Sequence, residues 1–187
     1  MISLTQLWLP IVLGAVFVFV ASSLVHMVLK WHNSDYLPLP NEEAVREALN
    51  AQNPPPGQYV IPHCGDMKAM GTEAMQKKYK DGPVGFLVLK APGPISMGAP
   101  LFQWFLFTLV VSFFVAYVGA HSLPVGTHYR QVFRITGCVA FLAYGGGAAP
   151  AAIWMGKPWG SAFKDIADAL IYGLVTAGTF GWLWPHA

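Results

Sequence analysis

Residues 7–29 read LWLPIVLGAVFVFVASSLVHMVL, and this stretch decides the fold. No Asp, Glu, Lys or Arg occurs anywhere in residues 1–29. A helix needs roughly 20 predominantly apolar residues to cross the hydrocarbon core of a bilayer. Inside lipid, backbone groups must bond within their own segment, and a helix is the simplest chain that does so. The sequence therefore predicts a membrane-spanning helix over residues 7–29.

Three further segments without charged residues follow, at 91–129, 135–156 and 169–187. Only 11% of the chain is charged and 55% is hydrophobic, whereas soluble domains are about a quarter charged. Each segment supplies most of one spanning helix, and we place these helices at residues 101–120, 132–155 and 166–184. The expected fold class is an all-α membrane protein with four transmembrane helices.

Residues 30–100 form one long polar connection, which we expect to fold as a small α+β lobe. Asn41 and Thr72 are each followed by Glu, a pattern typical of a helix start. Segments 58–61 and 85–89 read as short strands that can pair with each other. The expected division is a transmembrane helix at 1–29, the extramembrane lobe at 30–100, and three transmembrane helices at 101–187.

Basic residues predict the orientation in the membrane. Nine of the eleven Lys and Arg residues lie in the first and third connections, while Arg130 and Arg134 lie in the second. The positive-inside rule then places residues 30–100 in the cytoplasm and both termini in the periplasm. The net charge of only +2 gives no signal for a nucleic-acid partner.

The first candidate site is a possible metal site in the connection, at His63, Cys64 and Met67. Imidazole, thiolate and thioether groups together suit a soft ion such as Cu(I). However, no second cysteine or histidine lies nearby to complete the donor set. We therefore expect ordinary loop packing and no tight metal binding.

His26 is the one histidine within the predicted spanning helices, and we take it as the candidate cofactor ligand. An ionisable group inside a membrane is a functional candidate by default. His26 can ligate the magnesium of a chlorophyll or the iron of a haem, although a haem held by two histidines lacks its second one. The alternative is that His26 meets lipid headgroups or a neighbouring carbonyl.

Asp165 and Asp168 stand at the predicted start of the last helix, beside Lys164. Paired carboxylates can act in acid–base or proton-relay chemistry. The structural explanation is stronger, because acids at a helix N-terminus are favoured by the helix dipole. Lys164 and Asp168 are also spaced as an i, i+4 ion pair.

Small residues mark the last two predicted helices. Gly173, Ala177 and Gly181 recur every four residues, which places them on one face for close packing. This stripe can face a partner subunit or pack inside the chain. In the preceding helix, Gly145-Gly146-Gly147 followed by Pro150 favours a kink.

Three segments carry a resemblance to a known group of proteins: KYKDGPVG at 78–85, KDIADALIYG at 164–173 and TAGTFGW at 176–182. On these segments the chain resembles a family of small, uncharacterised inner-membrane proteins of bacteria with four helices. The resemblance implies a bacterial inner-membrane location. It brings no catalytic residues to this sequence.

The function expected from the sequence is that of a non-catalytic accessory subunit. No P-loop, GxSxG, HExxH or CxxCH motif is present, so an enzyme is not expected. Helices with glycine stripes and aromatic residues suit packing against other membrane subunits of an energy-converting complex. We rank a photosynthetic complex ahead of a respiratory one, with lipid, bacteriochlorophyll or carotenoid contacts. The alternative is a small carrier or copper-handling protein that uses the cluster from His63 to Met75.

Overall fold

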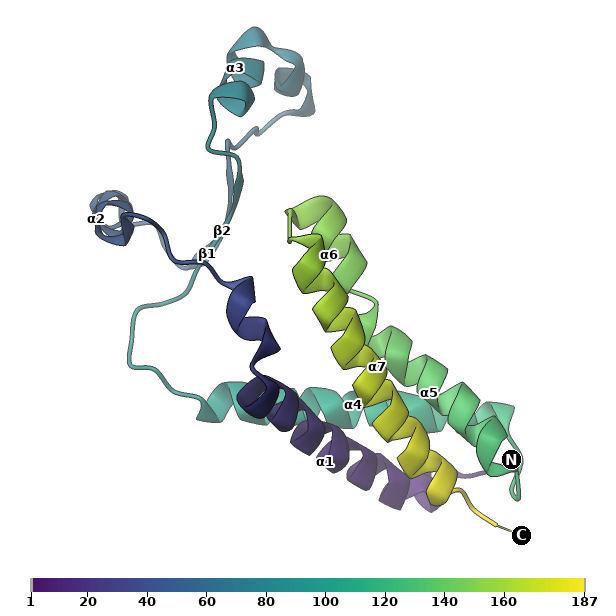
Figure 1. Cartoon of the computed structure of the whole chain (residues 1–187). Coiled ribbons are helices and arrows are strands. Elements are labelled where there is room, and N and C mark those ends of the chain that lie inside the picture. The colour runs from purple at the N-terminus through teal and green to yellow at the C-terminus, as the bar shows by residue number, and fades with distance from the viewer. Residues whose placement is uncertain (1, 187) are drawn as a thin grey trace. The chain divides into compact units, whose positions relative to one another are not determined.

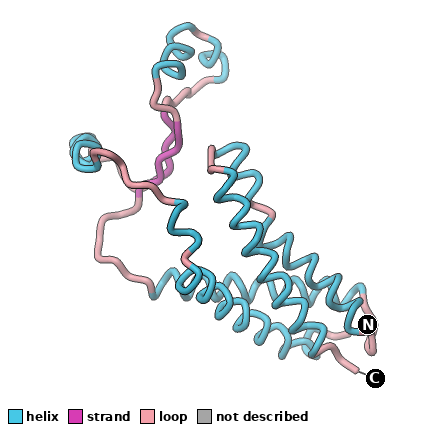
Figure 2. The backbone as a smooth tube through the Cα atoms, viewed as in Figure 1, coloured by secondary structure: helices cyan, strands magenta, loops and turns pink. Residues whose placement is uncertain are grey.

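A computed structural model describes residues 2–186, which divide into two compact units. The helical unit comprises residues 2–36, 96–152 and 158–186. The small unit comprises residues 37–95 and 153–157. Figure 1 shows the helices of both units, and Figure 2 shows that the strands belong to the small unit.

The helical unit is built around four long helical segments. The first begins with the 3₁₀ turn η1 (Leu4–Leu7), continues as α1 (Trp8–Leu24) and ends in a π-helical turn, η2 (Val25–Leu29). A second 3₁₀ turn, η3 (Trp31–Asp35), follows it. The other segments are α4 (Gly98–Ser122), α5 (Tyr129–Gly145) with α6 (Ala148–Met155), and α7 (Trp159–Trp182).

Three of these segments are long and apolar enough to span a membrane, namely Leu4–Leu29, Gly98–Ser122 and Tyr129–Met155. The chain therefore fits a multi-pass membrane protein, as its composition predicts. α7 has 24 residues, a length that also suffices to cross. It is more polar, with Lys164, Asp165 and Asp168 in its first half, and it is not among the three.

The glycine run breaks the third segment, as expected. α5 ends at Gly145, α6 begins at Ala148, and the Gly146 N–H donates to the Leu142 carbonyl at 2.9 Å. A Cβ added at Gly146 would lie 2.6 Å from that carbonyl oxygen. Only glycine therefore fits at this position without moving the backbone.

α1, α4, α5 and α7 pack as a ring in which α1 contacts α4, α4 contacts α5, α5 contacts α7 and α7 contacts α1. The contact between α5 and α7 is the most extensive. Small residues allow it: a Cβ added at Gly137 would lie 2.9 Å from Cβ of Ala177. At Gly173 an added Cβ would lie 3.3 Å from the Gly137 carbonyl oxygen. Much of the Gly173, Ala177 and Gly181 stripe thus packs inside the chain.

The small unit consists of two short helices and a hairpin. α2 (Glu42–Gln52) begins at Asn41, whose side chain accepts from the Ala44 N–H. β1 (Gly57–Ile61) pairs antiparallel with β2 (Gly85–Leu89), and η4 (Met67–Gly71) and α3 (Glu73–Asp81) lie between the strands. All of residues 37–95 are described, and none of them is buried. This unit therefore has no closed apolar core.

Candidate metal centre

One end of the helix ring carries ionisable side chains from three separate segments. His26 lies in η2, His32 in η3 and Asp168 in α7. Each side chain offers one metal-ligating atom, and these three atoms all lie within 4.8 Å of one another. We call this group the His–His–Asp triad.

The turn after α1 brings the two histidines together. The chain widens into the π-helical turn Val25–Leu29, and Lys30 then adopts a left-handed φ of 52° that ends the helix. η3 follows and contacts α7. The His26 and His32 rings consequently stack, with centroids 4.8 Å apart and planes 8° from parallel. π-helical turns are frequent at functional sites.

His32 bridges two carboxylates. Its Nδ1 lies 2.7 Å from Oδ2 of Asp35, and its Nε2 lies 2.9 Å from Oδ2 of Asp168. Without a metal ion, each ring nitrogen of His32 has one carboxylate oxygen within hydrogen-bond distance. In that state the cluster is an ion-pair network that fastens η3 to α7.

That network leaves one polar atom unsatisfied. The Asp168 side chain is only 8% exposed, and its Oδ1 is buried with no hydrogen-bond partner among the described residues. A buried carboxylate oxygen without a partner costs free energy, because it has lost its water. A cation beside Asp168 would compensate that cost.

Both structural explanations offered for Asp168 from the sequence are wrong. α7 begins at Trp159, where the Pro158 carbonyl accepts from the Ala162 N–H, so Asp165 and Asp168 do not lie in its first turn. Lys164 does not form the expected ion pair with Asp168. Its ammonium is instead held by three groups of η3: Asp35 Oδ1 at 2.6 Å, Ser34 Oγ at 2.7 Å and the Trp31 carbonyl at 2.8 Å.

Lys164 also fixes the charge of Asp35. The hydrogen bond from the Lys164 ammonium lowers the pKa of Asp35 to about 2, and the hydrogen bond from His32 acts in the same direction. Partial burial of the carboxylate raises the pKa, but this effect is smaller than that of the hydrogen bond from Lys164. Asp35 is therefore ionised at physiological pH, where it can orient the His32 ring.

The triad can close around one metal ion. Ligand atoms lie about 2.0–2.2 Å from a transition metal, so two ligands of the same ion are about 3–4 Å apart. His32 Nε2 and His26 Nε2 lie 2.9 Å and 3.8 Å from Asp168 Oδ2. The ligating atoms of the triad are separated by as much as 4.8 Å, so the stacked rings must both tilt and move closer for both nitrogens to bind one ion. His26 has room for this because its side chain is 53% exposed.

In both histidines, the ring nitrogen that is not directed at Asp168 already has a hydrogen-bond partner, as is usual for histidines that bind metals. His26 Nδ1 lies 3.0 Å from the Ser22 carbonyl oxygen, and His32 Nδ1 lies 2.7 Å from Asp35. A metal-bound histidine almost always gives its second N–H to a carbonyl or a carboxylate, which fixes the tautomer and the ring orientation. Both histidines of the triad have such a partner.

The candidate metal site in the long connection is built differently from the triad. The Cys64 thiol donates to the Asp66 carbonyl oxygen at 3.0 Å within its own loop, His63 is exposed, and the Met67 side chain is 81% exposed. Within residues 2–186, the triad is the group of three His, Cys, Asp or Glu side chains with convergent ligating atoms. The prediction that His63, Cys64 and Met67 pack as an ordinary loop and bind no metal tightly stays untested.

Sequence reasoning singled out His26 and Asp168 as candidates but did not consider His32 or Asp35. Both follow the spanning helix directly, where polar residues are ordinary, so neither stood out. The available signal was the density of polar residues in Trp31–Asp35, combined with an aspartate inside an apolar helix at 168. Comparisons with protein-family models, with curated proteins and with solved structures found no match for this chain.

Proposed function

We propose that this protein is a membrane metalloprotein that binds one divalent transition-metal ion through His26, His32 and Asp168. The observation that carries the proposal is the convergence of two imidazole nitrogens on a buried carboxylate that has an unpartnered oxygen. The support of each imidazole by a carbonyl or carboxylate strengthens it.

The donor set indicates the class of metal. Two imidazoles and one carboxylate suit Fe(II), Mn(II) or Zn(II), and the absence of sulfur among the three ligands disfavours Cu(I). Three protein ligands leave coordination positions open, which is typical of a site that binds water or substrate. The proposed role is therefore to present a Lewis-acidic ion to a small ligand.

Metal content of the purified protein tests this proposal. After exposure to Zn(II), Mn(II) or anaerobic Fe(II) and removal of excess ion, we expect about one ion per chain. Asp168→Asn keeps the side-chain shape and should lose the ion, as should His32→Ala. The control is His121→Ala, since His121 lies exposed in the last turn of α4 and bonds the Tyr117 carbonyl. The proposal is contradicted if the wild-type protein retains none of the three metals. It is also contradicted if the Asp168→Asn protein retains about one ion per chain, as the wild-type protein should.

A second candidate function is that of an accessory subunit in a bacterial energy-converting membrane complex, with a photosynthetic complex ranked first. One observation favours it: in the most apolar 18 residues of each of the three spans, only 28%, 28% and 17% are buried within the chain. Their remaining surface is available to lipids, pigments or other membrane subunits. Purification in mild detergent at native expression tests this role. Co-migrating subunits are expected, and a protein that always migrates alone contradicts it.

The proposed topology completes this picture. We propose a bacterial inner-membrane protein in which α7 is the fourth crossing. Both termini are then periplasmic and residues 30–100 are cytoplasmic, so the triad lies near the cytoplasmic surface. The distribution of Lys and Arg and the ring of four long helical segments support this arrangement.

A further inference from the structure

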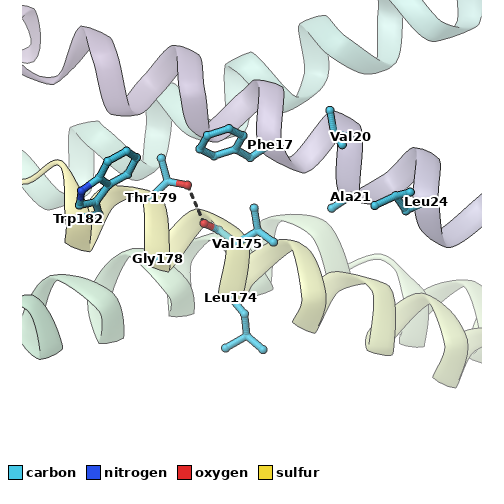
Figure 3. Close-up of a pocket in the computed structure, with 9 residues that line it drawn as sticks. All are labelled: Phe17, Val20, Ala21, Leu24, Leu174, Val175, Gly178, Thr179 and Trp182. Atoms are coloured by element: carbon cyan, nitrogen blue, oxygen red, sulfur yellow. Dashed lines mark hydrogen bonds between the residues drawn. The ribbon is translucent and has the colours of Figure 1, made fainter.

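A groove of about 460 Å³ lies between α1 and α7 (Figure 3). Phe17 and Leu24 of α1 and Leu174 and Trp182 of α7 contribute large apolar side chains to it. The one hydroxyl in its lining, that of Thr179, donates to the Val175 carbonyl of the same helix at 2.8 Å. The other side-chain donor in the lining is the indole N–H of Trp182, and the remaining lining side chains are apolar, so the occupant must be largely apolar.

Small residues provide the space in the groove. Ala21 lines it from α1 and Gly178 lines it from α7. A Cβ added at Gly178 would meet no atom within 4 Å, so this glycine borders open space. By contrast, an added Cβ at Gly137, in the α5–α7 contact, would lie 2.9 Å from Ala177.

The size of the groove favours a single chain over a helix as occupant. From Leu174 to Trp182 the lining extends about 12 Å along α7, at 1.5 Å per residue. A volume of about 460 Å³ over that length gives a mean width of about 7 Å. A helix with its side chains is about 10–12 Å wide, which is too wide to enter. A lipid acyl chain is apolar, thin and present at this depth of a membrane.

Along the axes of α1 and α7, the His–His–Asp triad lies just beyond one end of the groove. His26 lies only two residues beyond Leu24, and Asp168 lies about 9 Å along α7 from Leu174. The triad thus lies within two helical turns of the groove along both helices, although His26 is not among the lining residues. An acyl chain in the groove would bring the polar end of its lipid to the level of the triad.

We propose that the groove binds an acyl chain of a membrane lipid and that the polar end of this lipid occupies the open positions of the metal. The substrate class of the site is then an acyl lipid that enters sideways from the bilayer. This inference rests on the proposed metal site, and the experiment below separates the two.

The experiment uses the full-length protein in phosphatidylcholine vesicles that contain a phosphatidylethanolamine with a photoactivatable diazirine on its acyl chain. After illumination, we expect peptides from residues 17–24 and 174–182 to carry most of the label. Gly178→Leu fills open space, so it should fold and lose this labelling down to the level of other lipid-facing peptides. Gly160→Leu is the matched control: the same change on the same helix, also with no atom within 4 Å, but outside the groove.

A second measurement tests whether the lipid coordinates the metal ion. In detergent, the Co(II)-loaded protein should change its visible spectrum when phosphatidylethanolamine is added, and so should Gly160→Leu. Gly178→Leu should bind Co(II) normally and show no such change. Two results would overturn the inference without contradicting the proposed metal site. One is a label spread uniformly over all the helices, and the other is a wild-type Co(II) spectrum that lipid does not change.

Failure of the metal site has its own signature. If the wild-type protein binds no ion yet labels in the groove, the proposed function is wrong, and the assignment of the lipid as a metal ligand is overturned with it. If His32→Ala and Asp168→Asn lose the ion but keep the groove label, the two sites are separable, as the inference requires.

Discussion

At one end of the helix ring, Ile2, Leu7, Leu123 and Trp184 are buried in an apolar cluster, and the Trp184 indole N–H is satisfied by the Pro124 carbonyl at 3.1 Å. At the other end, the chain buries charge: the Asp35 and Asp168 side chains are 9% and 8% exposed. We call these the apolar end and the polar end.

The apolar end is explained by its contribution to stability, whereas the polar end is not. Apolar packing with a satisfied indole closes the apolar end at no electrostatic cost. Burying carboxylates is costly even when they are paired, and apolar residues of similar volume often stabilise as well or better. The polar end also leaves one oxygen of Asp168 without a partner among the described residues. Folding alone therefore does not account for the polar end.

The largest effect on stability is expected at the apolar end. Trp184→Ala removes a side chain that is 1% exposed and should lower the free energy of unfolding by about 3–5 kcal/mol. Trp154→Ala, at a position that is 77% exposed, is the control and should change it by less than about 0.5 kcal/mol. Denaturant unfolding in detergent measures both. Equal losses would mean that the apolar end does not hold the ring closed.

The polar end should instead gain stability from its ligand. At an ion concentration of 100 times the dissociation constant, binding should stabilise the wild-type protein by about 2.7 kcal/mol. Thermal unfolding with and without Zn(II) should show this as a raised midpoint, whereas Asp168→Asn should show no shift. Trp184→Ala serves as the contrast, because it should retain the metal-dependent shift at a lower starting midpoint. A shift of the same size in Asp168→Asn would place the ion elsewhere.

The helix contact between the two ends predicts a smaller loss. Gly137→Ala would place Cβ 2.9 Å from Cβ of Ala177, and such overpacking should cost about 1–3 kcal/mol. Gly178→Ala makes the same change in open space and should be neutral or stabilising by up to about 1 kcal/mol. The difference in unfolding midpoint between these two variants is the measurement. Indistinguishable midpoints would show that α5 and α7 do not approach as closely as described.

The apolar half of this contrast could be predicted from the sequence, and the polar half could not. The long apolar runs identify spanning helices because membrane helices need length and hydropathy alone. His26 was identified by the same rule, as an ionisable group within an apolar run. Its partners were not, because the π-helical turn and the left-handed Lys30 that position His32 have no clear sequence signature.

Asp168 shows the same limit over a longer distance. Local rules explained this residue by the helix dipole and by Lys164, four residues before it. The structure gives it His32 as a partner, 136 residues away in the chain, and gives Lys164 to Asp35. The explanation by the helix dipole failed because α7 begins at Trp159, which places both aspartates beyond its first turn.

Orientation should distinguish the two ends without changing stability. In a background with Cys64 and Cys138 replaced by serine, Ser122→Cys lies at the apolar end and Asn50→Cys lies in the small unit. Both positions are exposed. A membrane-impermeant maleimide applied to intact cells should label Ser122→Cys and spare Asn50→Cys. The reverse pattern would place the polar end at the periplasmic surface.

X-ray absorption of the protein loaded with Zn(II) tests the central claim most directly, because it reports which atoms surround the ion. Coordination by His26, His32 and Asp168 predicts a first shell of nitrogen and oxygen at about 2.0–2.2 Å with the outer-shell scattering of two imidazoles. If the half-exposed His26 is replaced by alanine and the protein still binds zinc, the imidazole signal per ion should fall by half. A first shell that contains sulfur at about 2.3 Å would assign the ion to Cys64 instead and contradict the account.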